Sequence, residues 1–144
     1  MCSGKITDGP LSVHLRRDED VDGVEVGPYA DFDAFRSFVT AQLEGGNEGS
    51  RFPTLIMHSD CDGEWSVEEV FRLGKELEVI GEEMKRFAAI PFPSEWQATI
   101  ARFKGIRPCD ASESFIDVDG EPLVQRLKAL ADESLSRNLP ISFQ

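Results

Sequence analysis

The amino-acid sequence predicts an α+β fold, in which a small mixed or antiparallel sheet of about four to five strands has three to four helices packed on it. Three observations lead to this class. The chain has 144 residues, the size of one domain. Apolar residues alternate with polar ones near both ends, which is typical of strands. Between them, two Ser-x-x-Glu/Gln signals each precede residues with helical spacing.

Residues 1–10, which end in Asp-Gly-Pro, are predicted to be a flexible leader, and residues 11–144 a single domain. Apolar and polar residues alternate over 11–15 and again over 24–26, so each segment is predicted to be a short strand. The acidic segment between them contains a glycine and is typical of a turn. The two strands are therefore expected to pair as a hairpin.

A helix and a strand are predicted next. Asp31 is predicted to cap a helix in which phenylalanines recur at helical spacing and which ends at Gly45-Gly46. Residues 52–57 are predicted to form a strand, because the apolar run Leu55-Ile56-Met57 suggests burial on both faces.

The clearest helix start is a capping box in which Ser66 caps the amide of Glu69 and Glu69 reaches back to Ser66. Apolar residues then follow at steps of three to four, which predicts a helix of about five turns. They are Val70, Leu73, Leu77, Ile80, Met84 and Phe87. Pro91 and Pro93 are expected to end this helix.

A shorter helix is predicted to start at a second capping box, formed by Ser94 and Gln97. Trp96, Ile100 and Phe103 recur at helical spacing and are predicted to mark one face of it.

The last part of the chain contains one more predicted helix. Residues 115–118 fit either a strand or an extended approach to that helix. The helix is predicted to begin at Pro122, because proline is favoured in the first turn, and to end at Asn138. Residues 141–143 alternate again and are predicted to be a terminal strand.

The charge balance restricts the classes of partner. The net charge is −12, and residues 1–100 hold 20 acidic and 9 basic side chains, or −11 of it. Such a field repels phosphate backbones, so nucleic-acid binding is not expected. It would attract a basic partner and speed its association, although solubility alone also accounts for it. Arg102, Lys104 and Arg107 form one basic cluster, which is read as a solvated face because it is too small for a nucleic-acid footprint.

Cysteine usage and hydropathy indicate a cytoplasmic protein. No apolar run is longer than the four residues 87–90, so no membrane span and no secretory signal are expected. The three cysteines are an odd number, which does not suggest a disulfide framework.

Asp-x-Asp-Gly occurs three times, at residues 20–23, 60–63 and 117–120. Each copy fits a tight turn, a site for Ca²⁺ or Mg²⁺, or an acidic surface. The EF-hand pattern fails, because Trp65 stands where the loop from Asp60 needs glycine.

Other catalytic patterns are weak or missing from the sequence. His58 and Cys61 lack the spacing of a zinc site, and no phosphate-binding loop or nucleophile elbow is present. No cofactor is therefore expected, whereas pairs of carboxylates are not excluded as general acids or bases. The alternative is a small metal-dependent enzyme or a divalent-cation-binding module that uses the Asp-x-Asp-Gly loops. Trp65 itself fits either a packed residue beside a helix start or an aromatic anchor among carboxylates.

Four segments of the chain resemble the immunity protein 70 family of bacterial polymorphic toxin systems. They are Phe-Pro-Thr-Leu-Ile-Met-His-Ser-Asp-Cys-Asp-Gly-Glu-Trp-Ser at 52–66, Asp-Gly-Val-Glu-Val-Gly at 22–27 with the helix start at 31–35, Phe-Ile-Asp-Val-Asp-Gly-Glu-Pro-Leu at 115–123, and Leu-Pro-Ile-Ser-Phe-Gln at 139–144. The resemblance implies a cytoplasmic inhibitor that binds a cognate toxin domain and neutralises it. It implies no catalytic residues.

The resemblance and the acidic charge together suggest a contact surface for a basic toxin domain, with a nuclease as one candidate. The predicted partner-binding residues are Asp60, Asp62, Glu64, Trp65, Glu68, Asp117, Asp119 and Glu121. The protein is expected to be a monomer or a weak homodimer.

Overall fold

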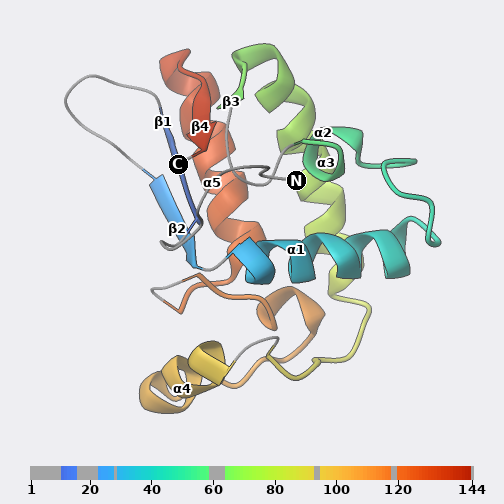
Figure 1. The fold of residues 1–144 in the computed structure, drawn as a ribbon, viewed down its shortest axis with the longest axis vertical. Helices are drawn as coiled ribbons and strands as arrows, with labels where there is room; N and C mark the ends of the chain where they lie inside the picture. The colour runs from blue at the N-terminus through green and yellow to red at the C-terminus, as the bar shows by residue number, and fades with distance from the viewer. Residues whose placement is uncertain are drawn as a thin grey trace, which may run out of the picture.

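Helices form the framework of the protein (Figure 1). The computed structural model describes residues 11–15, 23–27, 29–58, 64–92, 95–117 and 120–143. The helices are α1 (Tyr29–Phe38), the π-helical turn η1 (Val39–Leu43), α2 (Pro53–Ile56), α3 (Val67–Met84), α4 (Glu95–Lys104), the 3₁₀ turn η2 (Ala111–Glu113) and α5 (Leu123–Arg137). The strands are β1 (Leu11–Leu15), β2 (Gly23–Gly27), β3 (Glu64–Trp65) and β4 (Ile141–Phe143).

The core is built around the antiparallel pair of α3 and α5, which pack on each other more extensively than any other two elements described (Figure 1). A Cβ atom built on Gly74 would lie 3.9 Å from Ala131, and one on Gly81 would lie 3.8 Å from Val124. Both are ordinary contact distances, so the two glycines are not sterically required. The predicted stripe of α3 is confirmed: Val70, Leu73, Leu77, Ile80 and Met84 are buried, and Phe87 is partly buried against them.

The predicted start of α3 and the predicted end of α5 are confirmed, whereas α3 ends at Met84, before the predicted Pro91, and α5 begins at Leu123, one residue after the predicted Pro122. The Ser66 hydroxyl accepts a hydrogen bond from the Glu69 amide (3.2 Å), and the Glu69 carboxylate accepts one from the Ser66 amide (3.0 Å). Pro122 precedes the first residue of α5, and Asn138 ends the helix in the left-handed conformation (φ 57°). These signals are local, so they do not depend on the rest of the fold.

Four short strands pair in the order β2-β1-β4-β3, and all the pairs are antiparallel. The predicted hairpin is present, with Val13 opposite Val24. The terminal strand β4 lies between β1 and β3, because Ile141 is opposite both Leu15 and Trp65. The last residues of the chain are thereby joined to the segment that precedes α3.

The predicted α+β fold class is nevertheless wrong, because the described part of the chain is mostly helical. Its longest helix has 18 residues, whereas its longest strands have five and β3 has only two. The strands form a narrow ribbon at one side, and the core lies between helices (Figure 1). Two segments that could have widened a sheet do not do so.

The strand predicted over residues 52–57 is a helix, α2. Pro53 occupies its first turn, where a missing amide hydrogen costs nothing. The Glu76 carboxylate of α3 accepts hydrogen bonds from the Thr54 and Leu55 amides (3.1 and 3.0 Å). Since short apolar runs fit buried strands and buried helices equally, this capping from a distant residue decides the outcome.

Residues 115–117 follow the other alternative, an extended approach to α5. A single antiparallel bridge joins Ile116 to Pro122, and no strand is assigned there among the described residues.

The helix start predicted at Asp31 is also wrong, because α1 begins at Tyr29. Its predicted end is confirmed: η1 continues α1 as far as Leu43, and Gly45 follows with a φ of 63°. Residues 1–10, the predicted leader, lie outside the described residues.

Candidate functional site

The residues predicted to form a contact surface have very different exposures. Trp65 lies on β3 with none of its side chain exposed, and its indole Nε1 donates a hydrogen bond to the Thr54 carbonyl (3.0 Å). Its ring packs against the His58 ring, with centroids 5.1 Å apart. Of the two interpretations of Trp65, the structure therefore favours the packed one. Glu64 is half-buried and Glu68 is exposed, while Asp60 and Asp62 lie outside the described residues.

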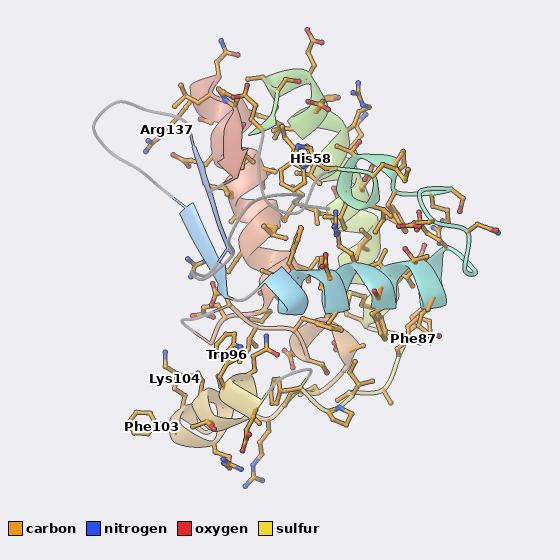
Figure 2. All side chains as sticks on the ribbon, in the orientation of Figure 1. His58, Phe87, Trp96, Phe103, Lys104 and Arg137 are labelled. Carbon is orange, nitrogen blue, oxygen red and sulfur yellow. The ribbon has the colours of Figure 1, made fainter. Side chains whose placement is uncertain are left out.

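The segment before Trp65 is fixed from α1. Arg36 donates hydrogen bonds to the carbonyl groups of Leu55, Ile56 and His58 (3.3, 3.3 and 2.7 Å). The His58 ring is 2.9 Å from the Glu64 carbonyl through Nε2, and Figure 2 shows it beside the start of α3. A side chain far away in the sequence thus sets the path of the segment that most closely resembles the family.

Asp117 is buried and serves the chain itself. Its carboxylate accepts a hydrogen bond from the Glu121 amide (3.0 Å) and lies 3.4 Å from Arg126, and none of its side chain is exposed. The Gly120 amide donates to the Asp117 carbonyl (3.0 Å), so the third Asp-x-Asp-Gly copy forms a turn. Glu121 is exposed, and Asp119 lies outside the described residues.

The structure does not bring together the two parts of the predicted contact surface, residues 60–68 and residues 117–121. Glu68 is at the start of α3, whereas Glu121 is at the start of α5, and the two helices run in opposite directions (Figure 1). The length of α3 separates them by roughly 25 Å, at 1.5 Å per residue. A single small contact area therefore does not include both groups.

The solvent-facing side of α3 forms a continuous exposed stripe. At 100° per residue its members lie within an arc of about 120°, opposite the buried face. This outer α3 stripe consists of Glu68, Phe71, Arg72, Lys75, Glu78, Val79 and Glu82, all of them exposed. Phe71 and Val79 are large apolar side chains among carboxylates, and the ammonium group of Lys75 lies 4.3 Å from the centre of the Phe71 ring.

The other three glutamates of α3 are used within the molecule. Glu69 closes the capping box, Glu76 caps α2, and Glu83 pairs with Arg51. The glutamates of α3 that remain for an outside partner are thus Glu68, Glu78 and Glu82, of which Glu82 pairs with Lys85 (3.3 Å). The sequence predicts the capping role of Glu69, but it does not show that Glu76 and Glu83 bind distant parts of the chain.

A groove of about 370 Å³ adjoins the stripe between α3 and α5. Gly81 and Val124 contribute to its lining, Glu78, Glu82 and Asp132 contribute carboxylates, and Lys85 and Lys128 contribute ammonium groups. Lys85 pairs with Glu82 and Lys128 with Asp132, so the groove carries side chains of both charges.

Glu44 is the most completely hydrogen-bonded carboxylate that the structure describes, and sequence reasoning missed it. It accepts hydrogen bonds from the amides of Gly49, Arg51 and Phe52 and from the Thr40 hydroxyl (3.1, 3.0, 2.9 and 3.0 Å). Burial opposes ionisation, but these donors outweigh burial and lower the pKa of Glu44. Its role is to hold the loop before α2 in its folded conformation. The sequence indicates this role only by placing a glutamate directly before a glycine-rich loop.

Phe103 was predicted to lie on the buried face of α4, and this prediction is wrong. The predicted face of Trp96, Ile100 and Phe103 is not the buried one: Gln97 and Ala101 are buried, and Phe103 is 89% exposed. In Figure 2, Phe103 projects away from the rest of the protein.

The described residues give no direct support to the metal-binding alternative. Within them, no three His, Cys, Asp or Glu side chains form a group that could hold a metal ion. The Asp60–Asp62 loop and Asp119 lie outside the described part, so cation binding there stays a prediction. Cys109 is exposed and free. None of the described helices is both long enough and apolar enough to cross a membrane.

Comparison with known proteins gives one match. The model of the family described as immunity protein 70 matches residues 14–143, nearly the whole chain. No curated protein and no solved structure matches the chain significantly.

Proposed function

Because the chain belongs to the immunity protein 70 family, we propose that it binds a cognate bacterial toxin domain and neutralises it by a stoichiometric protein–protein contact. The observation that carries this proposal is the family match over residues 14–143. An immunity protein acts as an inhibitor, so the proposed function needs no catalytic residue. The site of action is proposed to be the cytoplasm of the cell that makes the toxin.

We further propose that the toxin domain is basic, with a nuclease as one candidate. The net charge of −12 would attract a basic domain over a distance and speed its association. Carboxylates can also occupy a cleft that binds phosphate groups, because carboxylates and phosphates are both negatively charged. The outer α3 stripe supports this proposal, since it combines exposed carboxylates with the apolar side chains of Phe71 and Val79.

The proposed contact surface differs in part from the residues predicted by sequence. Glu68 belongs to it, and Asp60, Asp62 and Glu64 would extend it from the preceding segment. Trp65 is assigned a supporting role, because none of its side chain is exposed. Asp117 is likewise buried, and it fixes the turn before α5, so it is not proposed to touch the toxin.

The first test is growth rescue in a host that lacks both proteins. The C-terminal domain of the protein encoded immediately upstream is expressed with and without this chain. Restored growth together with copurification of a one-to-one complex supports the proposal. If the domain kills and this chain neither restores growth nor binds it, the proposal fails for that toxin.

The second test locates the contact surface by charge reversal. Glu68→Lys with Glu78→Lys is expected to weaken toxin binding and to reduce its dependence on salt, because screened attractions are lost. Glu48→Lys is the matched control, since it reverses an exposed glutamate outside α3. An equal loss of toxin affinity per reversed charge in both variants would show that the affinity depends on the net charge and not on the position of the glutamate. No effect of the α3 variant would remove α3 from the contact surface.

A further inference from the structure

The most exposed large apolar side chain that the structure describes is Phe103, at the end of α4. It is 89% exposed, compared with 65% for Met57 and 47% for Phe71. Exposed apolar residues are common on protein surfaces, but a phenylalanine left almost wholly in water is not explained by packing. Helical spacing groups it with Trp96 and Ile100, which are both partly buried. Phe103 is thus the uncovered end of an apolar stripe.

The helix that carries Phe103 is held to the rest of the protein by its buried face, although it packs on the other described elements much less than α3 and α5 pack on each other. The Gln97 side chain is buried and donates a hydrogen bond to the Ile116 carbonyl (3.0 Å). Ala101 is buried as well, and its carbonyl accepts a hydrogen bond from the Ile106 amide (2.8 Å). Figure 2 shows Trp96 on the side of α4 toward the rest of the protein and Phe103 on an outer side. Phe103 therefore projects into solvent from the side of α4 that faces away from the buried Gln97 and Ala101.

Exposed basic side chains lie close to Phe103 in the sequence of an otherwise acidic protein. Arg102, Lys104 and Arg107 are all exposed, and together with Phe103 they define the α4 patch. The chain as a whole carries −12, so the sign of this patch is opposite to that of the protein. An aromatic ring flanked by arginine is the composition most often found at the energetic centre of protein interfaces.

We propose that the α4 patch is a second contact surface for the toxin domain, on which Phe103 enters an apolar pocket bordered by carboxylates. This inference rests on the proposed function, and it adds an anchor of opposite charge to the outer α3 stripe. The two charges act at different ranges. The net charge of the chain attracts a basic domain over a distance, whereas the α4 patch recognises a local acidic pocket after contact.

Three other occupants of the patch fit the observations less well. A nucleic acid is disfavoured because three cations within a chain of −12 give little attraction for a phosphate backbone. A membrane is disfavoured because one aromatic side chain buries too little apolar surface to hold a protein at the interface. A second copy of the chain is disfavoured because two molecules of −12 repel each other.

The test uses the full chain and the toxin domain from the rescue experiment, with dissociation constants measured by calorimetry. Phe103→Ala is expected to weaken binding by about tenfold or more, as truncation of an interface anchor does. Its melting temperature is expected to equal that of the wild type, because the side chain makes little contact. Arg102→Glu with Arg107→Glu is expected to weaken binding further, while Phe103→Tyr keeps the affinity near that of the wild type. Leu135→Ala, which truncates a partly exposed leucine near the far end of α5, is the matched control and is expected to bind normally.

Each outcome of the test separates this inference from the proposed function. If the wild type binds and Phe103→Ala binds equally well, the α4 patch is not a contact surface, although the proposed function stands. If the wild type does not bind the toxin domain, both proposals fall. Light scattering and titration with duplex DNA complete the test. A dimer or a DNA complex of the wild type that Phe103→Ala abolishes would assign the patch to that occupant and overturn the inference.

Discussion

Arg51 and Glu83 are joined by two parallel hydrogen bonds, from Nη1 to Oε1 (2.7 Å) and from Nη2 to Oε2 (2.5 Å). The Arg51 side chain also donates to the Leu43 carbonyl (2.8 Å), at the end of η1. Its bonds to Glu83 lower the pKa of that carboxylate. One side chain thus connects the end of η1 and the loop before α2 to the last turn of α3, where Glu83 lies.

The bidentate geometry predicts a measurable coupling between Arg51 and Glu83. In a double-mutant cycle of Arg51→Ala and Glu83→Ala, the coupling free energy is expected to be about 1 kcal/mol, because both side chains remain partly in water. It is measured by urea denaturation of the four proteins. The pair of Lys85 and Glu82 is the control: it is more exposed and has one contact of 3.3 Å, so its cycle is expected to give a value near zero. Equal coupling in both cycles would contradict the prediction.

Glu44 is predicted to make the stability of the protein depend on pH. Its folded-state pKa lies below the ordinary value of 4.5, so its contribution is present above pH 4.5 and is lost as the pH falls through the folded pKa. Glu44→Gln places an amide donor against backbone N–H donors and is expected to destabilise the protein by about 1–3 kcal/mol at pH 7. Denaturation with urea at several pH values measures the difference. That difference should narrow below pH 4.5, and a difference independent of pH would argue against the role assigned to the carboxylate.

Trp65 is predicted to stabilise the fold without touching the toxin domain. Trp65→Phe loses the hydrogen bond from the indole to the Thr54 carbonyl and leaves that buried carbonyl without this donor, so stability is expected to fall by about 1–3 kcal/mol. The affinity of the folded variant for the toxin domain is expected to be unchanged, because none of the Trp65 side chain is exposed. Denaturation and calorimetry give the two values. A loss of affinity without a loss of stability would return Trp65 to the contact surface.

Gly120 is predicted to tolerate a side chain less well than Gly46 does. Its φ is 83°, and a Cβ atom there would lie 2.9 Å from Ile106 Cδ1 and 3.2 Å from Lys104 Cδ. Gly46 has nearly the same φ, 85°, but nothing within 4 Å of its Cβ position. Gly120→Ala and Gly46→Ala both force alanine into the left-handed region, at about 1 kcal/mol or more. Thermal unfolding measures the stability lost in each variant. The additional loss in Gly120→Ala reports the contact of the new methyl group with Ile106 and Lys104, and equal losses in the two variants would show that these side chains move aside at no cost.

The parts of the fold that sequence reasoning predicted correctly depend on neighbours within about five residues. The capping box of Ser66 and Glu69, the left-handed Asn138 and the buried stripe of α3 are all of this kind. Each places a donor beside an acceptor, or apolar groups on one face, as soon as the helix forms. The hairpin at 11–27 also follows from its alternation and its turn.

The parts that failed depend on residues far away along the chain. The run Leu55-Ile56-Met57 becomes helical where Glu76 caps the helix from α3, and the acidic face of α3 is reduced by the partners that three of its glutamates find. Phe103 has the spacing of a core residue, but the way in which α4 is anchored turns Gln97 and Ala101 inward instead. Spacing along a helix shows which side chains share a face. Only the tertiary contacts decide which face is covered, because burial is settled by what packs against a helix and not by the helix itself.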